Sequence, residues 1–100
     1  MWVNICYLQL PFLEIILNIE SMENKEGLIW YNGNLIDWKD AKLHVLTHGL
    51  HYASSVFEGE RSYSGRIFKL HEHTERLFFS ASELDFEIPY TIEEIKAACY

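Results

Sequence analysis

The segment THGLHYASSVFEGERSY, residues 47–63, decides how the rest of the chain is interpreted. It places the aromatic residues Tyr52 and Phe57 among two glycines, with the cation Arg61 near its end. Aromatic walls with a few well-placed polar groups are typical of pockets for small molecules. Composition alone supports a second interpretation equally well, in which the glycines make turns and the aromatics belong to a core.

Apolar residues in the following segment recur with helical spacing. One face of a helix from about Glu72 to Asp85 would carry Leu70, Leu77, Phe78, Ala81 and Leu84. Arg76 lies beside this stripe, near the start of the helix. Taken alone, it would be interpreted as a surface arginine paired with Glu72 or Glu75.

These two segments together resemble the amino-terminal domain of the branched-chain amino-acid aminotransferases. The matching residues are His48-Gly49-Leu50-His51-Tyr52, Ser55-Val56-Phe57-Glu58-Gly59, Arg61, Tyr63, His73 and Arg76-Leu77. The resemblance extends from about Gly27 to Tyr100. Its Phe-Glu-Gly-x-Arg pattern is closer to the branched-chain group than to D-amino-acid aminotransferases or aminodeoxychorismate lyases. It implies a fold-type IV enzyme and a small α/β (α+β) domain, in which two β-hairpins form a sheet packed against helices.

The resemblance also implies a role for five residues. Tyr52, Phe57, Gly59 and Arg61 match positions that line the substrate pocket. Arg76 matches the residue that binds the phosphate of the cofactor, pyridoxal 5'-phosphate. An aromatic wall suits a branched aliphatic side chain, and a guanidinium can meet a phosphate with two parallel hydrogen bonds.

The resemblance places the catalytic lysine outside this segment. In the family, a lysine of the large carboxy-terminal domain holds the cofactor as a Schiff base and carries the proton. The lysines of this chain match none of that context: Lys25, Lys39, Lys42, Lys69 and Lys96. We therefore expect no catalytic residue here, and of the family's cofactor contacts only Arg76.

The family activity implied is amino-group transfer between leucine, isoleucine or valine and 2-oxoglutarate, with branched-chain amino acids and 2-oxo acids as partners. We expect this chain to be an inactive, truncated part of such an enzyme. A helix beginning at Ile92 reaches the last residue without a glycine cap, so residues 22–100 would form a small domain incomplete at its carboxy end. The missing large domain or a second copy of the chain would then be its partner.

Two other functions are compatible with the sequence. The chain could be a non-catalytic remnant or small-domain binding module, or belong to another fold-type IV enzyme such as a D-amino-acid aminotransferase. A downstream reading frame carrying the lysine domain would distinguish an enzyme part from a remnant.

Composition limits the classes of function. A chain of 100 residues allows one modest domain, and a net charge of −7 without a basic patch argues against nucleic acid. Cys6 and Cys99 make no disulfide framework or zinc spacing, which favours a reduced, cytoplasmic setting. No metal site is expected, because no ligand set accompanies the five histidines; we predict hydrogen-bonded structural roles for His44, His48, His51, His71 and His73.

Residues 1–21 are far more apolar than the rest, and the composition changes at Met22. A secretory signal is disfavoured because no Lys or Arg precedes Lys25. A membrane span is disfavoured by Pro11 and Glu14, and a peripheral anchor by the lack of a basic face. We interpret 1–21 as an extension upstream of the native start that is not part of the fold.

Local patterns predict the remaining elements. Asn32-Gly33 and Ser64-Gly65 predict the tips of two hairpins, which would make most of one sheet. Residues 43–45 are predicted to form a strand, and 56–58 a helical turn capped by Ser54 or Ser55 and ended by a left-handed Gly59. Residues 91–94 form a capping box with a Tyr90–Ile95 staple, which predicts a helix from Ile92.

Deletion of residues 1–21 should leave folding intact, because the break in composition at Met22 separates them from the domain. Thermal unfolding and solubility of the shortened chain would measure this. A collapse of folding on deletion would contradict the prediction.

Overall fold

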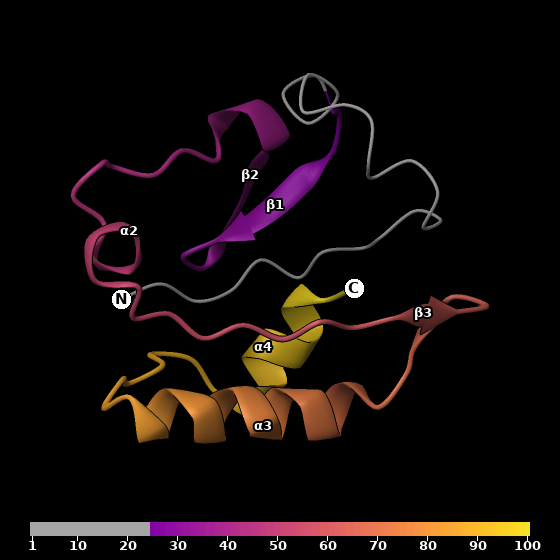
Figure 1. Cartoon of the computed structure of the whole chain (residues 1–100). Helices are drawn as coiled ribbons and strands as arrows, with labels where there is room; N and C mark the ends of the chain where they lie inside the picture. Colours follow the sequence, from indigo (N-terminus) through magenta and orange to yellow (C-terminus); the bar gives the residue numbers. More distant parts are fainter. Residues whose placement is uncertain (1–24) are drawn as a thin grey trace, which may run out of the picture.

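The computed structural model describes residues 25–100, so the predicted extension at 1–21 lies outside the described residues. Figure 1 shows a hairpin of β1 (Leu28–Tyr31) and β2 (Asn34–Asp37) at the top and the long helix α3 (Leu70–Glu83) at the bottom. Between them in the chain come η1 (Trp38–Asp40), α2 (His48–Tyr52), β3 (Ser62–Tyr63) and β4 (Arg66–Ile67), and α4 (Ile92–Ala98) follows α3. The mixed helix and strand content confirms the predicted fold class.

The first hairpin forms where the sequence predicts it. Ile29 pairs with Ile36 and Trp30 with Leu35, around a two-residue turn in which Asn32 and Gly33 have φ of 49° and 87°. Two successive positive φ angles match the right-handed twist of the strands, and asparagine and glycine tolerate them.

The second hairpin also forms, around Ser64 and Gly65 with φ of 49° and 76°. The prediction that both hairpins share a sheet is wrong, because each forms its own two-stranded sheet. The strands β3 and β4 have only two residues each, and the chain turns directly from β4 into α3. Within the part of the chain described, no strand bridges the two hairpins.

The predicted strand at residues 43–45 is a turn instead. The amide and hydroxyl of Thr47 donate to the carbonyl of His44 at 2.9 and 2.6 Å. The Nδ1 atom of His44 accepts from the amide of Leu46 at 3.1 Å. These local bonds already pair the amides of Leu46 and Thr47 and the carbonyl of His44. A strand would need a neighbouring strand to pair such groups, so the turn is favoured here.

The predicted helical turn at residues 56–58 is also wrong, because residues 53–61 carry no helix or strand. The turn of helix lies earlier, in α2, and Ala53 ends it in the left-handed conformation with φ of 55°. Gly59 is not left-handed. Ser54 follows α2 and donates to the carbonyl of Tyr52 at 3.4 Å, so it does not cap the start of a helix.

Helices α3 and α4 pack together and contain most of the buried apolar residues. The buried side of α3 is formed by Leu70, Thr74, Leu77 and Ala81, which recur at helical spacing. Ile95 and Cys99 are buried at α4. Of the predicted apolar stripe, Leu84 is instead exposed, since α3 ends at Glu83.

The capping box that begins α4 is confirmed. The Glu94 amide donates to the Thr91 hydroxyl at 3.2 Å, and the Glu94 carboxylate accepts from the Thr91 amide at 2.7 Å. The bond from the Thr91 amide, together with one from the Thr91 hydroxyl at 2.8 Å, holds the pKa of the Glu94 carboxyl below its usual range. Just before the helix, Tyr90 packs edge-on against Trp30, with ring centroids 4.8 Å apart, and so connects α4 to the first hairpin.

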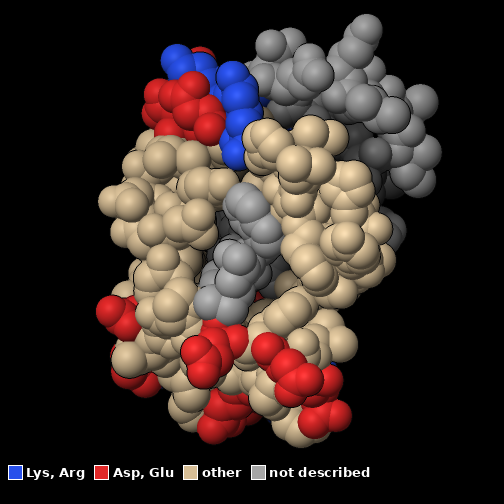
Figure 2. Space-filling view, turned by 90° about the vertical axis from the view of Figure 1, so that its left-hand side faces the viewer, with Lys and Arg blue, Asp and Glu red and all other residues tan. Residues whose placement is uncertain are grey.

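Charge is unevenly distributed over the surface. Figure 2, which views the left-hand side of Figure 1, shows acidic side chains gathered at the lower end, where α3 and the following segment lie. Exposed carboxylates in this part of the chain include Glu83, Asp85 and Glu87. The carboxy-terminal end of α3 and the segment that follows it therefore disfavour an anionic ligand. No helix among residues 25–100 is long and apolar enough to cross a membrane.

Gly33→Ala should destabilise the fold more than Gly65→Ala. Both glycines have positive φ, which costs an alanine about 1–2 kcal/mol. A Cβ at Gly33 would also lie 3.3 Å from the Tyr90 hydroxyl, whereas one at Gly65 meets nothing within 4 Å. Urea unfolding of both variants would measure the difference, and equal losses would show that the Tyr90 contact does not matter.

Candidate functional site

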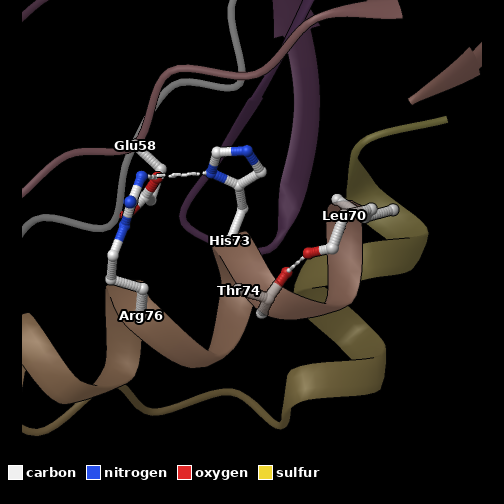
Figure 3. A network of polar contacts seen from close by, with 5 residues as sticks. All are labelled: Glu58, Leu70, His73, Thr74 and Arg76. Carbon is white, nitrogen blue, oxygen red and sulfur yellow. Dashed lines mark hydrogen bonds and ion pairs between the residues drawn. The ribbon is translucent and has the colours of Figure 1, made fainter. Parts of the chain in front are cut away.

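The loop of residues 53–61 runs along α3, and the Glu58 carboxylate of the loop binds side chains of that helix (Figures 1 and 3). Glu58 accepts from Arg76 through both oxygens: Nε donates to Oε1 at 2.6 Å and Nη2 to Oε2 at 2.7 Å. His73 approaches the same Oε2 with Nδ1 at 2.7 Å. Because His73 and Arg76 are three residues apart on a helix, they share the face that meets the loop.

The carboxylate determines which nitrogen of His73 carries a proton. An ionised carboxylate only accepts, so the Nδ1 atom of His73 must donate to Glu58. Nη2 of Arg76 and Nδ1 of His73 lie 3.3 Å apart because both donate to the same oxygen. Glu58 therefore receives three hydrogen bonds from two side chains of α3.

Burial and charge act on Glu58 in opposite directions. Its side chain is only 8% exposed, which disfavours the charged form. The hydrogen bonds from Arg76 outweigh this, and with the contribution of His73 they hold the pKa of Glu58 below its usual value of 4.5. The same pairing raises the pKa of Arg76, so both partners stay charged at neutral pH.

Arg76 is thus paired, but not with Glu72 or Glu75 as its sequence neighbourhood suggested. Glu75 lies 3.5 Å from His71 instead. Sequence reasoning missed Glu58, its actual partner, because 18 positions separate the two residues. The only signal was a carboxylate inside the Phe-Glu-Gly-x-Arg motif of the loop.

The other predicted site residues lie along the same loop or next to it. Phe57 and Gly59 flank Glu58, and the Arg61 carbonyl accepts from the Phe68 amide at 2.8 Å, which anchors the end of the loop. Tyr52 ends α2, where its ring lies 4.7 Å from that of His48.

The alternative interpretation of Tyr52 and Phe57 as core aromatics is wrong. Tyr52 is 72% exposed and Phe57 is 80% exposed. Both rings therefore remain available to a ligand or to another part of a larger protein.

The predicted hydrogen-bonded structural role is confirmed for two histidines: His44 closes a turn, and His73 binds Glu58. His71 lies 3.5 Å from Glu75, and both of these side chains are more than half exposed. Within residues 25–100, no group of histidines, cysteines and carboxylates could hold a metal ion.

A groove of about 790 Å³ lies between the first hairpin and α4, away from this network. Its described lining includes Ile29, Trp30, Tyr90 and Ala98, and contains no Lys or Arg. A phosphate needs a cationic partner, so this groove is a poorer candidate for a phosphorylated ligand than Arg76.

No family model matches the chain. Individual relatives do match it, among them branched-chain aminotransferases. The probable branched-chain-amino-acid aminotransferase of Rickettsia typhi is 58% identical over 67 residues, which are 67% of this chain and 23% of that protein. The branched-chain-amino-acid aminotransferase of Pseudomonas aeruginosa is 50% identical over 82 residues, which cover 78% of this chain and 27% of that protein.

Two solved structures share the fold. The branched-chain amino acid aminotransferase of Escherichia coli superposes with a TM-score of 0.71 at 43% identity, over 75% of this chain and 26% of that one. In sequence and fold, this chain belongs to the branched-chain aminotransferase family. A second enzyme of the family, solved in complex with N-(5'-phosphopyridoxyl)-L-glutamate, superposes with a TM-score of 0.70 at 47% identity, over 74% of this chain and 26% of that one.

The chain spans about a quarter of the length of the aminotransferases it matches, and the match falls in their amino-terminal part. The predicted resemblance is therefore confirmed for the family. The roles of Tyr52, Phe57, Gly59, Arg61 and Arg76 stay predictions.

The donors of Arg76 that Glu58 does not use suit a phosphate group. A guanidinium has five N–H groups, and Glu58 uses one on Nε and one on Nη2. Nη1 makes no hydrogen bond to any described residue, and the side chain is 63% exposed. The free edge of the guanidinium can therefore donate to phosphate oxygens while the other edge stays bound to Glu58.

Glu58→Gln should lower the melting temperature at neutral pH by about 5 °C for a unit of this size. Since the folded-state pKa of Glu58 is lowered, its stabilisation is fully present above pH 4.5 and is lost as pH falls through the lowered pKa. The difference from wild type should therefore shrink in acid. Thermal unfolding from about pH 7 to pH 3 would measure it.

Glu87→Gln is the matched control, because it removes the same charge from an exposed position. A gap between wild type and Glu58→Gln that stays constant into strong acid would contradict an ionised role for Glu58.

Proposed function

We propose that residues 25–100 form the small-domain wall of a branched-chain aminotransferase active site. The reaction is amino-group transfer between leucine, isoleucine or valine and 2-oxoglutarate, in the cytoplasm. In this proposal Arg76 binds the phosphate of pyridoxal 5'-phosphate, and the loop around Phe57 faces the substrate. A large domain supplies the lysine that carries the cofactor.

The observation that carries the proposal is how the Arg76 guanidinium is paired and exposed. One edge of its guanidinium is engaged by a buried carboxylate, and the other is available on an exposed side chain. An arginine held in this way keeps its charge and presents donors in a fixed plane, which is what recognition of a phosphate dianion requires.

The exposed aromatics support the substrate side of the proposal. Phe57 is next to Glu58 in the loop, and Tyr52 ends the helix that leads into it. Large apolar groups in water are unfavourable unless something covers them. A branched aliphatic side chain and the adjoining domain would cover these two.

The chemistry of the reaction belongs to the cofactor, which stabilises negative charge at the substrate Cα when it is bound. The contribution of this chain is binding and orientation. Arg76 fixes the phosphate end of the cofactor, Phe57 and Tyr52 exclude water on one side, and Arg61 and Gly59 belong to the same wall.

Arg76→Lys, in this chain joined to or complemented by a lysine-bearing large domain, should weaken binding of pyridoxal phosphate by about tenfold. A fork with two parallel donors becomes a single point charge. Fluorescence or absorbance titration with the cofactor would measure the dissociation constant. Arg66→Lys is the matched control, because Arg66 is an exposed arginine on β4. Unchanged cofactor affinity in Arg76→Lys would refute the phosphate role.

A further inference from the structure

We propose that Glu58 is a positioning residue that holds the Arg76 guanidinium in one orientation and locks the 53–61 loop to α3, so that the phosphate contact and the substrate wall form one rigid unit. The identity of the anion rests on the proposed function. The orientation of Arg76 and the attachment of the loop rest on contacts within this chain alone.

The orientation follows from the two-point contact. A single hydrogen bond would leave a guanidinium free to swing about the bond axis. Two bonds, from Nε and Nη2 to the two oxygens of Glu58, fix both the plane of the guanidinium and its rotation. Nη1, on the opposite edge, then faces away from the carboxylate in a defined direction.

The burial of the partners shows which one acts as the anchor. The Glu58 side chain is 8% exposed, whereas that of Arg76 is 63% exposed. A buried carboxylate must stay hydrogen-bonded, and His73, 21% exposed, supplies a third bond from the same helix. Glu58 is therefore the more buried partner, and its carboxylate fixes the direction of the exposed guanidinium.

The loop gains its position from the same contact. Residues 53–61 have no regular secondary structure to hold them. The Arg61 carbonyl anchors the end of the loop to Phe68, and the Glu58 side chain anchors its middle to α3. Because Phe57 and Gly59 are the immediate neighbours of Glu58, any displacement of this carboxylate would move both.

A simpler role for Glu58, in which only its negative charge matters, makes a different prediction for anion binding. If only the charge of Glu58 mattered, it would simply repel a phosphate near Arg76. A variant that keeps this charge but weakens the two-point contact with Arg76 would then leave the phosphate affinity unchanged. Under the positioning role, the same change weakens binding. Glu58→Asp separates the two, because it keeps the charge and shortens the side chain by one methylene.

The experiment is NMR of the arginine Nε–H groups in the whole chain, which contains only Arg61, Arg66 and Arg76. Arg76→Lys assigns the signal of Arg76. Hydrogen exchange of its Nε–H reports the bond to Glu58, the amide of Gly59 reports the loop, and titration with inorganic phosphate reports anion binding. Glu72→Asp is the matched control, since Glu72 lies on α3 and has no hydrogen bond to Arg76.

We expect Glu58→Asp to speed exchange at the Arg76 Nε–H by about tenfold, to shift or broaden the Gly59 amide, and to weaken the phosphate response by about fivefold. Glu72→Asp should change none of these. Glu58→Gln is a second variant with the same expected effects on exchange and on the loop, should the aspartate variant not fold.

Exchange and Gly59 signals within twofold of wild type in both Glu58 variants would overturn the positioning role. A wild-type Arg76 that is protected by Glu58 but does not respond to phosphate would support the positioning role and count against the proposed phosphate contact. The two proposals can therefore fail separately.

Discussion

The placement of the Glu58 carboxylate, nearly buried and bound by two side chains of α3, is the interaction on which the site depends. A carboxylate removed from water needs charged or strongly polar donors, and within its surroundings Arg76 and His73 supply them. The loop has no ladder or helical bonds of its own between residues 53 and 61. The Glu58 side chain is therefore a main contact that holds this irregular loop to α3.

Helix α3 can bind the Glu58 carboxylate and also contribute to the core because it has two different faces. Leu70, Leu77 and Ala81 form the buried face toward α4, while His73 and Arg76 project toward the loop (Figure 3). The apolar face fixes the rotation of the helix, since turning it would expose the buried residues. The packing of the core thus determines which side of α3 carries Arg76, and the two bonds to Glu58 then fix the direction of its guanidinium.

Features whose cause is local could be predicted from the sequence, and features whose cause is distant could not. Asn32-Gly33, Ser64-Gly65 and the Thr91–Glu94 capping box carry their geometry within two to four residues, and all three form as expected. The strand expected at 43–45 fails because His44 and Thr47 close a turn with their own side chains. Arg76 and Glu58 are 18 positions apart, so no periodicity could reveal their pairing.

The Glu58–Arg76 pair has one nearly buried and one exposed partner, which argues that it does more than stabilise the fold. An ion pair with one exposed partner contributes at most about 1 kcal/mol to folding, and a loop can be held to a helix as well by apolar packing. What apolar packing cannot provide is a charged, planar donor whose outer edge stays free and whose direction is fixed. The exposed edge of Arg76, beside a loop that carries the exposed Phe57, is therefore the feature that best supports the proposed phosphate contact.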